Sequence, residues 1–317
     1  MGCGVSGLTT AVCLVEAGLR VHIWADAAPE NTTSAAAGAM WGPYLVEPRN
    51  RVEDWSRRTL DELCGLAARS RTGVRMVGGV EAGRQALAEP WWGRLLPHFR
   101  RCDPEELPQP FVDGFRLIVP LVDMPTYLGY LKERFEASGG LLDLRRVSTL
   151  DEASDGAPIC VNCSGIGARS LVPDESVWPT RGQLVIVENP GIEEFFSEDT
   201  GLSSHLRHIY PQGETVVLGG SADEGIWSLE PDPVTTQRII RGCAELDPRL
   251  GPARVIAQRV GLRPTRSRVR LEEERVGGGR RVFHNYGHGG AGVTLSWGCA
   301  HDIKAWIMSG AGSSGRG

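Results

Sequence analysis

This chain of 317 residues contains no apolar run of about 18 residues, so no membrane-spanning helix is expected. No basic segment precedes Arg20 in the apolar N-terminal region, which argues against a signal peptide. A net charge of −5 without a block of like charge argues against a nucleic-acid partner. The eight cysteines lack the spacing of a small disulfide-bonded scaffold. These absences favour a cytoplasmic protein of about two domains with free thiols and no membrane partner.

Two short patterns are of the kind found in metal or redox sites, but the residues around them do not support such a site. Cys160 and Cys163 form a CxxC pair, but the surrounding apolar residues are typical of a buried strand. We therefore interpret both as core cysteines rather than as a redox pair or a zinc site. His205 and His208 could form a metal pair, but no third ligand stands near them in the sequence. We expect no metal.

The run HNYGHGGAGVTLS at residues 284–296 is the most informative segment of the chain. Its glycines at 287, 289, 290 and 292 lie beside two histidines, an asparagine and a tyrosine. Glycine costs backbone entropy, so such a cluster indicates positive φ angles or a close backbone approach. The apolar residues that follow, from Val293 to Trp306, indicate a helix. A glycine turn that opens a helix directs N–H groups and a positive helix end toward an anion or a polarised ring.

The N-terminal segment repeats this design. Gly2, Gly4 and Gly7 form a GxGxxG pattern, which a helical run and then an extended run at residues 21–24 follow. Asp26 stands nineteen residues after Gly7, close to the spacing of about 20 for a carboxylate that binds a ribose hydroxyl. The pattern predicts a dinucleotide site. The chain begins one residue before Gly2, without the strand that normally precedes the turn, and we expect weaker cofactor binding for this reason.

The remaining elements alternate along the chain without an internal repeat or a long linker. Residues 27–45 are small and turn-like, and residues 52–66 and 123–138 have helical patterns. Short strands are predicted at 115–119, 141–144, 158–161, 184–187 and 216–218, and strand-like character alternates with arginine over 254–270. Because cofactor signals lie at both ends and in the middle, the two domains must be interleaved.

Taken together, these motifs resemble those of the D-amino-acid oxidase family over nearly the whole chain. The resemblance is carried by residues 284–300 together with Gly2–Gly7, Trp41–Tyr44, Asn162–Gly165, Arg181–Gln183 and the Gly-Leu-Arg-Pro segment at 261–264. It implies an α/β fold in which a Rossmann-type FAD-binding domain is interleaved with a mixed-sheet substrate-binding domain. It also implies oxidation of a D-amino acid to a 2-oxo acid and ammonia, with dioxygen reduced to hydrogen peroxide.

The resemblance also assigns site residues. Arg263 matches the arginine that binds the substrate carboxylate, a role that suits the planar guanidinium. Tyr44 matches an aromatic residue near the pocket. The expected FAD contacts are Gly2, Gly4, Val5, Ser6, Gly7, Asp26, Thr32, Thr33, Ala37, Gly38, Ser164, Gly165, Gly289, Gly290, Gly292, Val293 and Thr294.

One position departs from the family pattern. Three positions before Pro211, where the family has a carboxylate-binding tyrosine, this chain has His208. An imidazole can donate to a carboxylate, and a protonated one does so better, which would make activity more sensitive to pH. The alternatives are a passive lid residue or a partial loss of activity.

The sequence leaves several points open. The predicted FAD-binding domain comprises residues 1–45, 123–180 and 260–317, and the substrate-binding domain comprises 46–122 and 181–259. Arg207, His205 and His208 could instead select an acidic D-amino acid, and a glycine or secondary-amine oxidase or a weakly flavin-binding protein without activity are further alternatives. The oligomeric state is open, with a homodimer as one alternative.

Overall fold

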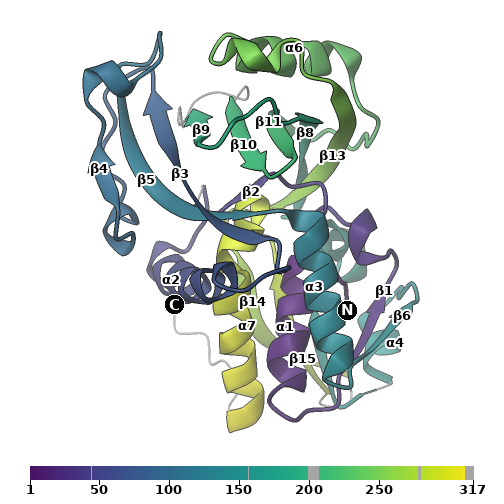
Figure 1. The fold of residues 1–317 in the computed structure, drawn as a ribbon. Helices are drawn as coiled ribbons and strands as arrows, with labels where there is room; N and C mark the ends of the chain where they lie inside the picture. The colour runs from purple at the N-terminus through teal and green to yellow at the C-terminus, as the bar shows by residue number, and fades with distance from the viewer. Residues whose placement is uncertain (44, 156, 199–206, 278–279, 311–317) are drawn as a thin grey trace.

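The structure, a computed structural model, describes residues 1–310 except 44, 156, 199–206 and 278–279, and the side chains of 154 and 155 are also left out. The chain forms two halves (Figure 1). Helices α1, α2, α3 and α7 gather in the lower half, and the large sheet with α6 forms the upper half. The described helices include none that is long and apolar enough to cross a membrane.

The first helix and strand form where the N-terminal pattern predicts them. Helix α1 spans Val5–Val15 and its residues from Gly7 to Val15 are all buried. Strand β1 (His22–Ala25) pairs in parallel with β6 (Leu141–Leu144). Helix α3 (Met124–Ala137) and helix α7 (Gly292–Ser309) both contact α1. The helix α1 is therefore enclosed because its apolar residues face neighbours on several sides.

Residues 1 and 2 lie between two parallel strands. The Gly2 N–H donates to the Trp24 carbonyl at 2.8 Å, and the Met1 carbonyl accepts from the Cys163 N–H at 2.9 Å. The Met1 ammonium donates to the Val161 carbonyl at 2.7 Å. Strand β7 (Ile159–Asn162) pairs in parallel with β15 (Arg280–Tyr286), which pairs antiparallel with β14 (Arg270–Val276). Residues 1 and 2 thus join β1 to β7, in the central place of this row of strands.

The larger sheet forms the second half. Its order is β12 (Asp223–Glu224), β8 (Trp178–Glu188), β11 (Thr215–Gly219), β10 (His208–Gln212), β9 (Phe195–Glu198), β3 (Val74–Gly83), β5 (Asp113–Val122) and β2 (Ala39–Met40). Strand β13 (Val255–Thr265) also pairs with β8, and β4 (Phe99–Arg101) with β5. Helix α6 (Pro233–Ala244) packs on the outer face, where Ile239 and Cys243 join Val185 and Leu218 in one core. The inner face shares the main core with α1, α3 and α7.

Helix α2 (Arg49–Ala67) packs directly on α7. A Cβ atom on Gly298 would lie 2.3 Å from the backbone of Trp55, so the two helices approach with their backbones in contact. The sequence-based domain division places residues 46–67 in the substrate-binding domain. The helix contacts α7, and it also contacts β3 and β5 of the larger sheet.

The remaining elements are short connections. They are η1 (Pro29–Asn31), η2 (Gly93–Leu95), η3 (Pro104–Glu106), α4 (Leu150–Asp155), η4 (Gly165–Gly167), α5 (Ala168–Leu171), η5 (Pro248–Leu250) and η7 (Gly289–Ala291). Cys160 and Cys163 are buried and free, as are most of the other cysteines, and burial raises the pKa of both thiols. Their interpretation as core residues is confirmed.

Candidate active site

The N-terminus of α1 presents backbone donors. Gly4 is the N-cap and has no capping side chain of its own, while the Val5 N–H donates to the Ser34 hydroxyl at 3.0 Å. In the described part of the chain, the N–H groups of Ser6 and Gly7 have no acceptor. Two free N–H groups at a positive helix end suit the pyrophosphate of a dinucleotide.

The glycines of this turn are required by close approach. A Cβ on Gly7 would lie 2.0 Å from the Gly2 carbonyl oxygen, and one on Gly2, whose φ is +88°, would lie 2.4 Å from the Cys163 carbonyl oxygen. The turn, α1 and the end of β7 therefore meet through their backbones. The residues present fit a bound FAD, because this packing leaves the helix end open to a phosphate.

The predicted front segment joins the two halves of the molecule. Asp26 is exposed directly after β1, as a ribose ligand should be. The Thr32 hydroxyl donates to the Pro29 carbonyl at 2.7 Å, and the Thr33 hydroxyl donates to the Leu262 carbonyl at 3.2 Å. A Cβ on Gly38 would lie 2.7 Å from the Val217 side chain. The two threonine hydroxyls thus shape the loop, and they remain able to accept hydrogen bonds.

Two glycine turns meet β13 beside the start of α1. Turn η4 follows Ser164, and a Cβ on Gly165 would lie 3.9 Å from Pro264. Turn η7 also contacts β13, and a Cβ on Gly292 would lie 3.9 Å from Val5. Gly290 is exposed and Val293 buried. The segments predicted to bind FAD therefore converge, although they are more than 100 residues apart in the sequence.

Thr294 has a structural partner that the motif did not indicate. Its hydroxyl donates to the Gly42 carbonyl at 3.0 Å and accepts from the Gly42 N–H at 3.1 Å. This exchange ties the first turn of α7 to the segment before Tyr44. Tyr44 itself, predicted near the pocket, lies outside the described residues, as does His205.

Arg263 lies on the inner face of the larger sheet, on β13. A Cβ on Gly182 would lie 2.6 Å from the guanidinium carbon and from both terminal nitrogens, so the guanidinium rests on the bare backbone of β8. One terminal N–H donates to the Ser221 carbonyl at 2.9 Å. Sequence reasoning did not foresee either partner, although an isolated glycine within a strand such as β8 is a signal of close approach.

We expect Gly182→Ala to displace Arg263 without changing any charge. Because the new methyl group would occupy the place of the guanidinium, KM for a D-amino acid should rise by about ten- to a hundredfold, as one well-placed charged hydrogen bond contributes roughly 1.5–3 kcal/mol. Steady-state kinetics measures this. Gly213→Ala is a poor control because its φ is +73°, whereas Gly65→Ala in α2 has open space and should leave KM unchanged. An unaltered KM in Gly182→Ala would contradict this placement of the arginine.

His208 lies beside Arg263 on the same face. A Cβ on Gly219 would lie 1.8 Å from its Nε2, and its ring stacks on Tyr210 with centroids 4.5 Å apart. The Nε2 atom is buried and has no hydrogen-bond partner among the described residues. Burial, together with the nearby Arg263 cation, lowers the pKa of His208 to about 3. The lowered pKa favours the neutral imidazole at neutral pH, so of the alternatives the geometry supports a neutral donor rather than a protonated one.

We accordingly expect His208→Tyr to leave the pH dependence of KM unchanged. A histidine with a lowered pKa is neutral at every pH above that value, and tyrosine stays neutral until about pH 10. Neither the histidine nor the tyrosine side chain therefore changes charge between about pH 5 and about pH 9. The measurement is KM for a neutral D-amino acid across this range. A profile that flattens on the acid side in the tyrosine variant would restore the imidazolium as a carboxylate ligand.

Two buried polar atoms near the glycine turns also lack partners. Among the described residues, Nε2 of His288 and Oδ1 of Asn285 have none. Burial lowers the pKa of His288 to about 4, so its ring is neutral. Both residues belong to the run at 284–296, but the sequence did not indicate a role for either. Buried polar atoms without a partner are uncommon in native proteins, so a polar ligand near these turns would supply the missing hydrogen bonds.

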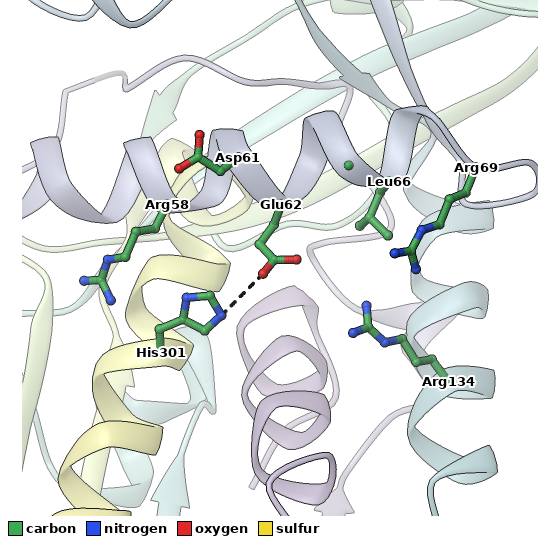
Figure 2. A pocket seen from close by; sticks show the side chains of 8 residues that line it. Arg58, Asp61, Glu62, Leu66, Arg69, Arg134 and His301 are labelled. Atoms are coloured by element: carbon green, nitrogen blue, oxygen red, sulfur yellow. Dashed lines mark ion pairs between the residues drawn. The ribbon is translucent and has the colours of Figure 1, made fainter.

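The described residues form no cluster of three or more histidine, cysteine or acidic side chains that could hold a metal. A separate cavity of about 350 Å³ lies between α2, α3 and α7 (Figure 2), away from Arg263. There Glu62 faces His301 at 3.6 Å, and Arg134 pairs with Glu16 at 2.6 Å. Its charges are largely paired within the protein, and none of its lining residues belongs to the predicted site.

Comparison with known proteins gives consistent results. A family model described as FAD dependent oxidoreductase (DAO) matches residues 1–306. A D-amino-acid oxidase of Rubrobacter xylanophilus is 51% identical, covering 96% of this chain and 94% of that protein. One of Streptomyces coelicolor is 48% identical, covering 95% and 93%. Human D-aspartate oxidase is 36% identical, covering 95% and 91%.

Two solved structures show the same fold at low sequence identity. Glycine oxidase from Geobacillus kaustophilus matches with a TM-score of 0.81 at 19% identity, covering 99% of this chain and 95% of that chain. Glycine oxidase from Bacillus cereus gives 0.79 at 17% identity, covering 98% and 96%. The predicted α/β fold class is confirmed.

Proposed function

The chain belongs to the family of FAD-dependent oxidoreductases that includes the D-amino-acid oxidases, and on this premise we propose that it oxidises D-amino acids. The products are a 2-oxo acid, ammonia and hydrogen peroxide. The observation that carries the proposal is the position of Arg263, on the inner face of the large sheet where β13 meets η4 and η7. The carboxylate anchor and the cofactor turns thus share one site.

The protein's part in this reaction is binding and orientation. Bound FAD supplies the two-electron acceptor that the amino-acid side chains lack, and dioxygen regenerates it. Arg263 pairs with the substrate carboxylate, and its contact with the Ser221 carbonyl fixes the direction of the guanidinium. A neutral His208 with its hydrogen on Nε2 can donate one further bond to the same carboxylate. Holding the substrate in one orientation is the main catalytic contribution of these residues.

The FAD contacts follow from the same geometry. The N–H groups of Ser6 and Gly7 hold the pyrophosphate, and Asp26 accepts from the ribose. The turns at Ser164–Gly165 and at 289–294 border the flavin. Thr32, Thr33, Ala37 and Gly38 would also contact the cofactor from the loop after β1.

The substrate side chain is neutral in this proposal. Arg207, which could attract a second carboxylate, already pairs with Glu245 at 3.0 Å and lies 3.8 Å from Glu198. An acidic substrate would have to compete with these two carboxylates. The acidic alternative follows from the similarity to a D-aspartate oxidase. A comparison of peroxide release from D-alanine and from D-aspartate distinguishes the two alternatives.

A substrate panel with a peroxide readout tests the function. We expect the purified protein to show flavin absorbance and to release peroxide with D-alanine, and less with D-aspartate, glycine or sarcosine. Peroxide mainly from glycine and sarcosine would favour the amine oxidase alternative. A colourless protein that produces no peroxide with added FAD would favour the inactive flavin-binding alternative.

The remaining expectations belong to this proposal. The FAD-binding domain comprises residues 1–45, 123–180 and 260–317, and the substrate-binding domain comprises 46–122 and 181–259. The protein acts in the cytoplasm, where its free cysteines stay reduced. For the oligomeric state a homodimer is one alternative, which light scattering tests directly, and cell fractionation tests the location.

A further inference from the structure

A chain of hydrogen-bonded polar side chains runs from the protein surface to turn η4. His284 on β15 and Asn162 on β7 are register partners and both are fully buried. Nδ2 of Asn162 lies 3.3 Å from Nδ1 of His284, and Nε2 of His284 lies 2.9 Å from an oxygen of Glu274. At the other end, Oδ1 of Asn162 accepts from the Ser164 N–H at 3.1 Å and from the Ser164 hydroxyl at 2.7 Å.

These contacts fix the position of every proton in the chain. The Ser164 N–H can only donate, so the Asn162 atom that it meets must be the carbonyl oxygen. The amide nitrogen of Asn162 therefore faces His284 and donates to Nδ1, which must be unprotonated. The ring hydrogen is then on Nε2 and is donated to Glu274. Only the neutral ring, in this tautomer, satisfies both neighbours.

The chain of side chains ends at the turn that we assign to FAD, which contacts the strand that carries Arg263. Ser164 begins η4, which contacts β13, and Gly165 lies against Pro264, the residue after Arg263. We propose that His284 is a positioning residue, whose neutral ring orients Asn162 so that Asn162 holds the Ser164 turn in its FAD-binding shape. The inference rests on the proposed function, since it assigns this turn to FAD.

Protonation of His284 would reverse the arrangement. A second ring hydrogen would place an N–H on Nδ1 against the N–H of Asn162, and the amide could relieve this only by turning its oxygen away from Ser164. Burial, then the nearby Arg270 cation, lowers the pKa of His284, while Glu274 and Glu272 oppose this. The titratable groups around the ring are Arg270, Glu272 and Glu274 on β14, Cys160 on β7, and Tyr286 on β15, which also bonds Asp174.

The sign of the pH effect follows from the lowered pKa. The neutral ring and the ordered turn persist above the ordinary histidine value of about 6.5, and they are lost as the pH falls through the lowered value. FAD affinity should therefore fall in acid. A single opposed N–H pair of roughly 1.4 kcal/mol corresponds to about a tenfold rise in Kd.

The first experiment measures FAD binding to the full chain by flavin fluorescence, between about pH 8 and about pH 5. His284→Asn retains an acceptor near Nδ1 and cannot titrate, so its Kd should not vary with pH. Glu274→Gln, at a half-exposed site that tolerates change, removes a charge that raises the pKa of His284, so the loss of affinity should move to lower pH. His98→Asn, at an exposed histidine before β4, is the matched control and should behave like the parent.

The second experiment does not depend on FAD. Hydrogen exchange of the cofactor-free protein reports the Ser164 N–H through peptides that cover residues 162–168. His284→Leu should raise exchange there by about tenfold, with Gly129→Ala as a helix control that should not. Unchanged exchange, or Kd curves of the parent and Glu274→Gln that superimpose, would overturn the role of His284. If exchange at Ser164 is slow and depends on His284, but the protein binds no FAD, the positioning role of His284 stands and the proposed function is contradicted.

Discussion

Replacing Arg263 by Leu is expected to lower kcat/KM for D-alanine by about two to four orders of magnitude while bound FAD and its spectrum stay unchanged. The substrate carboxylate would enter the inner face without its charged partner, and such a loss costs roughly 3–5 kcal/mol. The loss appears in kcat/KM because this ratio compares the transition state, in which the carboxylate is paired, with the free enzyme and free substrate. Peroxide release under steady-state conditions measures it.

Lys at this position should restore activity only in part. A point charge on a flexible stem cannot make the two parallel bonds of a guanidinium, and it would not reach the Ser221 carbonyl in the same direction. Arg259→Leu is the matched control. Arg259 precedes Arg263 on the same strand, β13, and it lies near Asp123. An Arg263→Leu enzyme that oxidises D-alanine at the parent rate would remove Arg263 from the site, and the proposed pocket with it.

Gly7→Ala is expected to abolish the retention of FAD during purification, which corresponds to a loss of affinity of at least about 100-fold. The new Cβ would lie 2.0 Å from the Gly2 carbonyl oxygen, so the start of α1 must move away from the turn. This displaces the N–H groups of Ser6 and Gly7 that we assign to the pyrophosphate. The same overpacking should lower the free energy of unfolding by about 1–3 kcal/mol.

Visible absorbance and equilibrium unfolding measure the two effects separately. Gly129→Ala is the matched control, because nothing lies within 4 Å of its added Cβ on α3. It should keep FAD and gain up to about 1 kcal/mol of stability from better helix propensity. A Gly7→Ala protein that stays yellow with the parent affinity would show that the phosphate binds elsewhere.

Local patterns predicted the elements whose residues repeat within one helix or strand. The spacing of Leu8, Ala11, Val12 and Val15 predicted α1, and Val21–Trp24 predicted β1, because periodic burial is written in consecutive residues. Strand β3 and helix α6 were not predicted. The glycines at 78, 79 and 83 obscure the alternation in β3. The fully buried face of α6 includes only two apolar side chains, Ile239 and Cys243, so its apolar pattern is weak.

The candidate site divides in the same way. The glycine motifs and Asp26 were predicted because their spacing is itself the signal. The contact of Val5 with Ser34, and the contacts of Arg263 with Gly182 and Ser221, were not predicted. These partners are distant in sequence and come together only when the chain folds. The charge state of His208 stayed open, because a sequence shows the residue type but neither its burial nor the nearby Arg263.

The sequence by itself therefore determined the family and the cofactor, and it supplied the proposal that Arg263 is the carboxylate anchor, since each depends on residue types at fixed spacing. Only the tertiary structure decided how these parts act together. It rests Arg263 on the bare backbone of Gly182, neutralises His208, and connects Glu274 to Ser164 through two buried side chains. The physical reason is that pKa values and hydrogen-bond directions are set by neighbours in space, and those neighbours come from strands that the chain pairs only after it folds.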